Sequence, residues 1–184
     1  MRYVIAACML VLLAMTGCAS ETAAPSRTAT PSHQVVHVEA SWVVLYHNLH
    51  DLKANSDAIV VATILQAKES TMNRGSVTTD FVVQIDRLVL DKKGLLTSPT
   101  FLLHQGGGVI KETTYIIDDD PLFQVKEQAV LFLKQNEAPL FFVTGGPSGR
   151  FRLQNGQVSP ANAAEGVAMQ TTNLEAFLAQ VAQA

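Results

Sequence analysis

Polar and apolar residues alternate along the segment from residue 77 to residue 88. The apolar or β-branched side comprises Val77, Thr79, Phe81, Val83 and Ile85. The polar side comprises Thr78, Asp80, Gln84 and Asp86. A period of two residues predicts a long strand with one buried face and one face in water. The strand is expected to end at the turn Asp91-Lys92-Lys93-Gly94.

Residues 58–65 form a continuous apolar run of strand length. Because the run has no polar side, it predicts a strand that is buried on both faces. Other segments of strand length are bounded by Gly, Pro or charged residues. They are residues 100–104, 108–117, 128–134 and 140–144.

A final pair of strands is indicated near residue 155. Phe151 and Leu153 alternate with Arg150 and Arg152. The dipeptide Asn155-Gly156 follows directly, and it favours the type I′ turn of a two-residue hairpin.

Helical spacing occurs near both ends of the domain. One apolar stripe predicts a helix over about residues 41–55; it comprises Trp42, Leu45, Leu49 and Leu52. A strand through residues 35–45 is the alternative, because this stretch contains several β-forming residues. A second stripe predicts a C-terminal helix, with Thr172 and Glu175 as its capping box. It comprises Leu174, Phe177, Leu178 and Val181.

The expected fold is mainly β (α+β), with about six or seven strands between an N-terminal and a C-terminal helix. A small OB-like barrel or a curved antiparallel sheet accounts for this pattern, because closure removes exposed strand edges. The spacing of strands does not determine their pairing, so a sandwich stays open as an alternative.

The N-terminus has the pattern of an export signal. Arg2 precedes an apolar run of about 12 residues, which is shorter than the roughly 20 needed to cross a bilayer. Residues 13–18 read Leu-Ala-Met-Thr-Gly-Cys and resemble the lipobox of bacterial lipoproteins, in which the cysteine is acylated and becomes the first residue. The resemblance implies a signal peptide over residues 1–17 and lipidation of Cys18. An ordinary signal peptide, with Cys18 as a bystander, is the alternative.

This resemblance implies a protein outside the cytoplasm that a lipid anchors to the cell membrane or the outer membrane. Residues 18–34 are rich in Ala, Ser, Thr and Pro, which predicts a disordered tether. Residues 35–184 are expected to form a single globular domain. The two cysteines are Cys8, in the signal, and Cys18, so the domain itself is expected to contain no disulfide and no cysteine nucleophile.

The order of the expected elements also resembles a group of uncharacterised secreted or lipid-anchored bacterial proteins. The order is a helix, Ser56-Asp57 opening an apolar strand, a long alternating strand, a Lys-Gly turn, a Gly-rich segment and Val130-Leu131-Phe132-Leu133. It is loosely similar to the netrin-like OB barrel of the tissue inhibitors of metalloproteinases over roughly residues 45–158. Those inhibitors act through a free N-terminal cysteine and contain disulfides, so the similarity implies a barrel and not inhibition.

Two glycine-containing segments could carry chemistry. Gly146-Pro147-Ser148-Gly149 is similar to a nucleophile elbow, but Arg150 stands where the elbow needs a second glycine. We therefore predict a turn between strands. Gly106-Gly107-Gly108 lacks the helix and the Lys-Ser/Thr of a phosphate loop, so a turn or bulge is expected.

Histidines and carboxylates offer two further candidate sites. His47, His50 and Asp51 lie opposite the leucine stripe of the expected helix, which favours a solvated face over a metal site. A metal site would also need His33, His37 or His104. Asp118-Asp119-Asp120-Pro121 lacks the rhythm of a calcium loop, so a solvated turn is expected.

The mild net charge of −3 is spread along the chain, and nucleic acid is not an expected partner. Our leading interpretation is a non-enzymatic binding or accessory domain in the cell envelope, held by lipid on Cys18, with an envelope protein as a candidate partner. No cofactor, catalytic residue or metal ligand is assigned. The alternatives are an envelope hydrolase or protease inhibitor on an OB-like barrel, and a metal-binding envelope protein.

Overall fold

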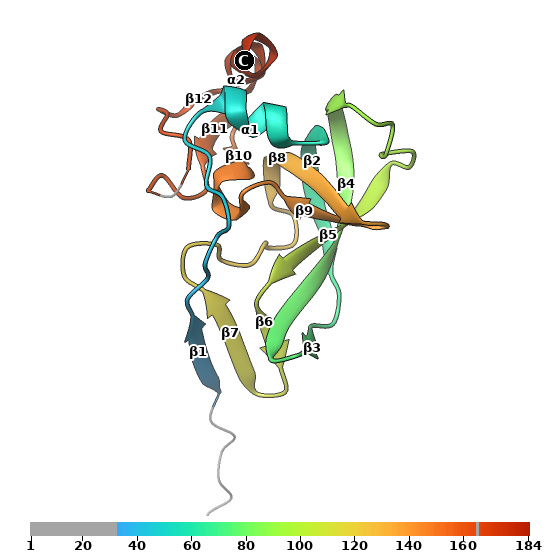
Figure 1. Ribbon diagram of the computed structural model, residues 1–184, viewed down its shortest axis with the longest axis vertical. Coiled ribbons are helices and arrows are strands. Elements are labelled where there is room, and N and C mark those ends of the chain that lie inside the picture. Colours follow the sequence, from blue (N-terminus) through green and yellow to red (C-terminus); the bar gives the residue numbers. More distant parts are fainter. Residues whose placement is uncertain (1–32, 165) are drawn as a thin grey trace, which may run out of the picture. The chain divides into compact units, whose positions relative to one another are not determined.

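Five strands close into a barrel in the computed structural model, which describes residues 33–164 and 166–184 (Figure 1). The barrel strands are β2 (Ala58–Ala67), β4 (Ser76–Asp91), β5 (Thr100–Gly106), β8 (Gln128–Glu137) and β9 (Leu140–Val143). Neighbours follow the order β8-β2-β4-β5-β9, and β9 returns to β8. Only the β5–β9 pair of this barrel is parallel. The expected small β barrel is confirmed.

Further short strands extend this barrel. β10 (Arg150–Gln154), β11 (Gln157–Pro160) and β12 (Thr172–Asn173) continue the sheet from β8, and β3 (Thr71–Asn73) pairs with β4. A separate sheet holds β1 (Gln34–Val38), β7 (Thr113–Ile117) and β6 (Gly108–Ile110). The described residues thus contain more strands than expected, because most of the added ones are too short to show a hydrophobic period.

β2 is buried on both faces from Ala58 to Ile64, as the apolar run predicts, but Leu65 at the end of that run is 42% exposed. β8 is also buried on both faces, from Ala129 to Leu133. Val60 and Ile64 of β2 point into the barrel, where they join Phe81. Ile59 and Val61 point to the other side. There they form a second core with residues of the two helices, α1 (Leu49–Asn55) and α2 (Leu174–Gln183). Burial of one large apolar side chain contributes about 1.5–3 kcal/mol, so these strands stabilise both cores.

Strands β9 and β10 occupy successive parts of one edge of β8. β9 pairs with Leu133 and Lys134, and β10 pairs with the residues from Ala129 to Leu131. The 3-10 helix η1 (Gly146–Gly149) interrupts the chain between these two strands. Arg150 pairs with Leu131, whose side chain lies in the barrel core, so the face of β10 that carries Arg150 continues the inner face of β8.

The expected helix over residues 41–55 is correct only in its second half. α1 begins at Leu49, because the Asn48 side chain accepts a hydrogen bond from the Asp51 N–H and caps the helix there. The segment of residues 39–48, here called the strap, is irregular and contains Trp42 and Leu45. β1 occupies the first part of the alternative strand. It starts at Gln34, one residue before the expected domain boundary.

The C-terminal helix is confirmed, but its expected capping box is wrong. Asn173 is the N-cap, and its Oδ1 accepts from the Ala176 N–H at 2.9 Å. Thr172 is instead part of β12, because it pairs with Val158 of β11. Neither helix in the described part of the chain is long and apolar enough to cross a bilayer.

Two turns differ in how far the sequence predicts them. The expected single strand over residues 108–117 is wrong, because Lys111 has a positive φ of 54° and the chain folds back into the β6–β7 hairpin. The hairpin at Asn155-Gly156 is confirmed, since both residues have positive φ and Gln154 pairs with Gln157. Asn-Gly marks a turn by its composition, whereas Lys111 shows no such signal.

Candidate functional site

A groove of about 820 Å³ lies between the loop that precedes β8 and the β10–β11 hairpin. This volume is within the range of ligand sites in proteins. The lining is mostly polar and combines amide, hydroxyl and charged side chains with a few aliphatic ones. Gln124 and Lys126 come from the loop, and Arg152, Gln154 and Ser159 come from the hairpin.

The alternation of β10 gives the groove its charge. Phe151 is buried in the second core beneath the helices. Arg150, Arg152 and Gln154 therefore share the opposite face of the strand, since successive side chains of a strand point to opposite sides. Arg152 pairs across the hairpin with Ser159, which places a cation and a hydroxyl side by side.

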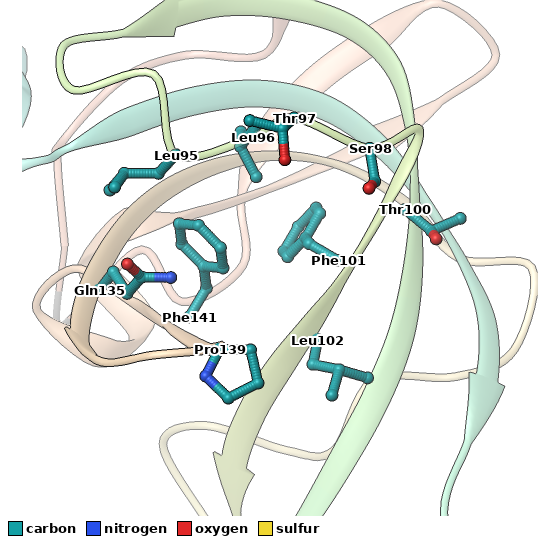
Figure 2. Close-up of a pocket in the computed structure, with 10 residues that line it drawn as sticks. All are labelled: Leu95, Leu96, Thr97, Ser98, Thr100, Phe101, Leu102, Gln135, Pro139 and Phe141. Atoms are coloured by element: carbon teal, nitrogen blue, oxygen red, sulfur yellow. The ribbon is translucent and has the colours of Figure 1, made fainter.

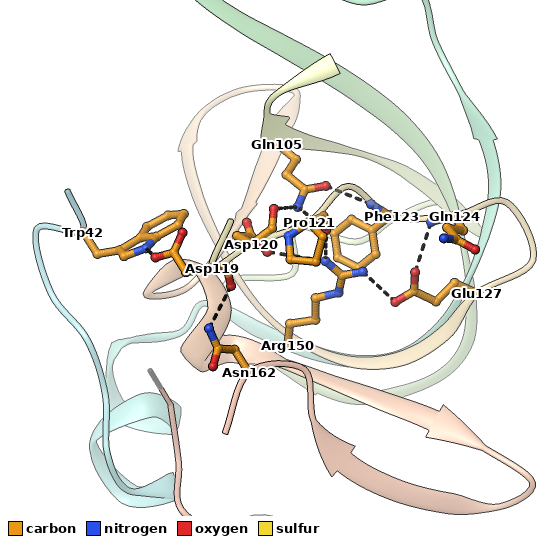
Figure 3. A network of polar contacts seen from close by, with 10 residues as sticks. All are labelled: Trp42, Gln105, Asp119, Asp120, Pro121, Phe123, Gln124, Glu127, Arg150 and Asn162. Carbon is orange, nitrogen blue, oxygen red and sulfur yellow. Dashed lines mark hydrogen bonds and ion pairs between the residues drawn. The ribbon is translucent and has the colours of Figure 1, made fainter. Parts of the chain in front are cut away.

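Arg150 is only 2% exposed, and several groups replace its water (Figure 3). Its Nη2 donates to Glu127 Oε1 at 2.7 Å, and its Nη1 donates to the carbonyl oxygen of Pro121 at 2.5 Å. Nη1 also lies 3.4 Å from Asp120 Oδ1. The guanidinium carbon stands 3.7 Å from the ring centroid of Phe123. Arg150 is therefore a structural cation that fixes the loop along the groove.

Phe123 connects this loop to the barrel. Its ring belongs to the barrel core and meets Phe81 edge-on, with 5.7 Å between the ring centroids. Gln105 of β5 accepts a hydrogen bond from the Phe123 N–H at 3.1 Å. Farther along, the N–H of Lys126 donates to the carbonyl oxygen of Ile64 at 2.8 Å. These contacts hold one wall of the groove against the barrel strands β2, β4 and β5.

The prediction of a solvated turn at residues 118–120 is wrong for Asp120, which is 5% exposed. Each of the three carboxylates has its own partner, because the loop crosses three different parts of the fold. Asp118 lies 2.6 Å from His37 Nδ1, Asp119 accepts from the Trp42 indole N–H, and Asp120 faces Arg150. Burial raises the pKa of the Asp120 carboxyl, while Gln105 and Arg150 act in the opposite direction.

Two cations of the groove are left without partners. The side chains of Arg152 and Lys126 make no hydrogen bond or ion pair with the described residues. The carboxylate of Glu127 is already engaged, since its Oε1 accepts from Arg150 and its Oε2 accepts from the Gln124 N–H. The groups of the groove that remain available are therefore cationic and neutral polar ones.

The two glycine-containing candidates are turns, as expected. Ser148 lies in η1 and is buried, and its Oγ accepts from the Tyr46 N–H at 3.1 Å. Gly107 and Gly108 have positive φ and connect β5 to β6.

The structure does not gather the candidate metal ligands. His50 pairs with Asp51 at 3.1 Å on the exposed side of α1. His47 is exposed and precedes α1. Three further histidines have separate partners: His33 contacts Thr114, His37 contacts Asp118 and His104 contacts Asp80. Within residues 33–164 and 166–184, no three His, Cys, Asp or Glu side chains lie close enough to hold a metal ion. Cys18 lies outside the described residues.

A second hollow of about 240 Å³ opens between β5 and the loop after β4 (Figure 2). Its lining includes the apolar side chains of Leu96, Phe101 and Phe141 and the polar side chains of Thr97 and Gln135. Its volume is below the range of sites that enclose a small-molecule ligand. The groove beside Arg150 is therefore the stronger candidate for a binding site.

Sequence reasoning noted the alternation of Arg150 and Arg152 with Phe151 but did not assign them to a site. The period of two was the sequence signal that could have found them, because it places both arginines on one face of the strand. It does not show that residues 121–127 oppose that face, because this loop precedes β10 by more than 20 residues and its placement depends on the tertiary fold. No protein-family model matches the chain, and no curated protein matches it.

Proposed function

We propose that this chain is an exported bacterial lipoprotein, anchored through lipid on Cys18, whose barrel domain binds another molecule of the cell envelope. The resemblance of residues 13–18 to a lipobox supports the anchor, and the small and polar composition of residues 18–34 supports a tether. The domain is proposed to act by binding and not by catalysis, with the groove beside Arg150 as its binding site.

The binding role is supported by one observation: some polar groups of the groove bind one another, and others have no partner in the part of the chain that the structure describes. Arg150, Glu127 and the Gln124 N–H bind one another and fix the walls. Arg152 and Lys126 line the same groove with no partner among the described residues. A site whose supporting groups already hold one another in place loses little freedom on binding, and this preorganisation favours affinity.

The test is to express the full-length protein in bacteria, separate the membrane fraction and measure the intact mass of the protein in it. We expect the membrane fraction to contain a chain that begins at Cys18 and carries acyl groups, because stable anchoring needs more than one lipid chain. Cys18→Ala should abolish the added mass and release the protein from the membrane. A membrane-free chain that is cut elsewhere and has an unmodified Cys18 would refute the anchor.

The binding role is tested in the same cells by chemical cross-linking. A stoichiometric adduct that forms with the anchored protein and is lost with Cys18→Ala is the expected result. An acylated protein that gives no adduct in the intact envelope would refute the binding role while leaving the anchor in place.

A further inference from the structure

The charge of the groove is opposite to that of the whole chain. The chain has a formal net charge of −3, yet the unpaired charges that line the groove belong to Arg152 and Lys126. A concave surface of one sign concentrates ligands of the other sign and speeds their association. The ligand of this groove should therefore carry negative charge.

Arg152 is suited to recognise a carboxylate in particular. β10 lies between β8 and β11, and the backbone of Arg152 pairs with Ala129 on one side and Ser159 on the other. Its side chain is half-buried, so part of its freedom is already lost. A guanidinium held in this way can bind both oxygens of a carboxylate through two parallel hydrogen bonds.

The rest of the lining indicates the class of ligand. Among the described residues that line the groove, none has an aromatic side chain. Nucleic-acid grooves stack bases on aromatic rings, and sugar rings pack on such rings in the same way. Gln124 and Gln154 instead offer amides, which can donate to and accept from a peptide backbone. Leu122 and Val125 also line the groove and offer aliphatic contacts.

We propose that the groove binds an extended, acidic polypeptide segment, with one carboxylate of the segment on the guanidinium of Arg152. Lys126 supplies a second cation at the loop side of the groove, and the amides contact the peptide backbone. This inference rests on the proposed binding function and names the class of its ligand. The segment belongs to a partner protein and carries aspartate or glutamate next to aliphatic residues.

The test is a selection of random nonapeptides, displayed on phage, on the full-length protein in detergent micelles. We expect the selected peptides to be enriched in aspartate and glutamate and to bind Arg152→Gln at least about tenfold more weakly, as the loss of a charge-assisted pair predicts. The matched control is Arg74→Gln, which removes the same charge from the turn between β3 and β4. It should leave the affinity unchanged.

Charge reversal provides a readout that a merely structural role of Arg152 would not change. Selection on Arg152→Glu should enrich lysine and arginine in place of the acidic residues, provided that the variant melts cooperatively like the wild type. The inference is overturned if the selection yields no peptides, if the peptides show no acidic enrichment, or if Arg152→Gln and Arg74→Gln bind them equally.

Two further probes separate peptide from other anionic ligands. Polygalacturonate and phosphatidylglycerol vesicles are compared with the selected peptides on wild type and Arg152→Gln. If either probe binds in a way that depends on Arg152 while no peptide binds, the proposed peptide ligand is overturned. The proposed binding function is then unaffected. The proposed function fails separately, in the cross-linking of the intact envelope.

Discussion

At the scale of single residues, Arg150 shows how a charge is held inside this fold. Its guanidinium loses water and gains Glu127, the carbonyl oxygen of Pro121 and the face of Phe123. Such a cluster is stable only when it is complete, because a buried charge that loses its partner has nothing to replace water. The loop that forms one wall of the groove therefore depends on Arg150.

Removal of Arg150 alone should leave two carboxylates close together without their cation. We predict that Arg150→Met lowers the free energy of unfolding by about 3–5 kcal/mol, measured by urea denaturation. Combining it with Asp120→Asn and Glu127→Gln should recover part of this loss. Arg152→Met is the control and should change stability by less than about 1 kcal/mol. Equal losses in the two single variants would contradict the structural role of Arg150.

Asp120 predicts a pH dependence of defined sign. Burial raises the pKa of its carboxyl above the unfolded value, so its contribution to stability is complete below about pH 4 and is lost as pH rises through the folded pKa. We compare unfolding free energies of wild type and Asp120→Asn across the acidic range. The wild type should lose stability relative to the variant as pH rises. A relative gain would mean that Arg150 outweighs burial.

Gly146 makes room for the strap. Its φ is +55°, and a Cβ at this position would overlap the indole ring of Trp42. Gly94 also has a positive φ, but a Cβ there meets nothing within 4 Å. Both alanine variants share the backbone penalty of roughly 1–2 kcal/mol, and Gly146→Ala should lose about 1–3 kcal/mol more from overpacking.

Tryptophan fluorescence tests this prediction directly, because Trp42 is the one tryptophan of the chain. Gly146→Ala should shift the emission to longer wavelength as the indole leaves its site, while Gly94→Ala should leave the spectrum unchanged. Identical spectra for both variants would show that the strap does not rest on η1.

At the scale of elements, the sequence predicted the structure correctly where buried and exposed side chains alternate regularly along a strand. The period of two in β4 is confirmed, since Val77, Phe81 and Val83 are buried. The stripe from Trp42 to Leu52 predicted too long a helix, because an Asn48 cap and the packing of Trp42 on Gly146 decide where α1 starts. The Asn48 cap is a local signal, whereas the packing of Trp42 is set by the tertiary fold and does not appear in local spacing.

The two faces of β4 should respond differently to truncation. Phe81→Ala removes a ring that is 1% exposed and should lower the free energy of unfolding by about 3–5 kcal/mol. Thr78→Ala on the opposite face should change it by less than about 0.5 kcal/mol. Asp80 on that face is not a silent control, because it lies 2.6 Å from His104 Nδ1. Similar losses for Phe81 and Thr78 in urea denaturation would contradict the assigned faces.

At the scale of the whole molecule, β2 and β8 serve two cores, and the groove lies where β10 leaves the barrel. The sequence predicted the β barrel, the C-terminal helix and the second half of the N-terminal helix. Its alternation around Phe151 also indicated that Arg150 and Arg152 share a face. It did not predict that the loop of residues 121–127 would meet Arg150, since contacts between distant segments leave no period in the chain.

The most direct test of this account asks whether the groove is occupied in the envelope. A photoreactive amino acid replaces Gln154, on the groove face of β10, or Met72, on β3 outside the groove, in the full-length chain. We predict a protein adduct from position 154 only, which is lost when Arg152→Gln is added. Adducts of equal yield from both positions, or an adduct that is indifferent to Arg152, would contradict a binding role for the groove.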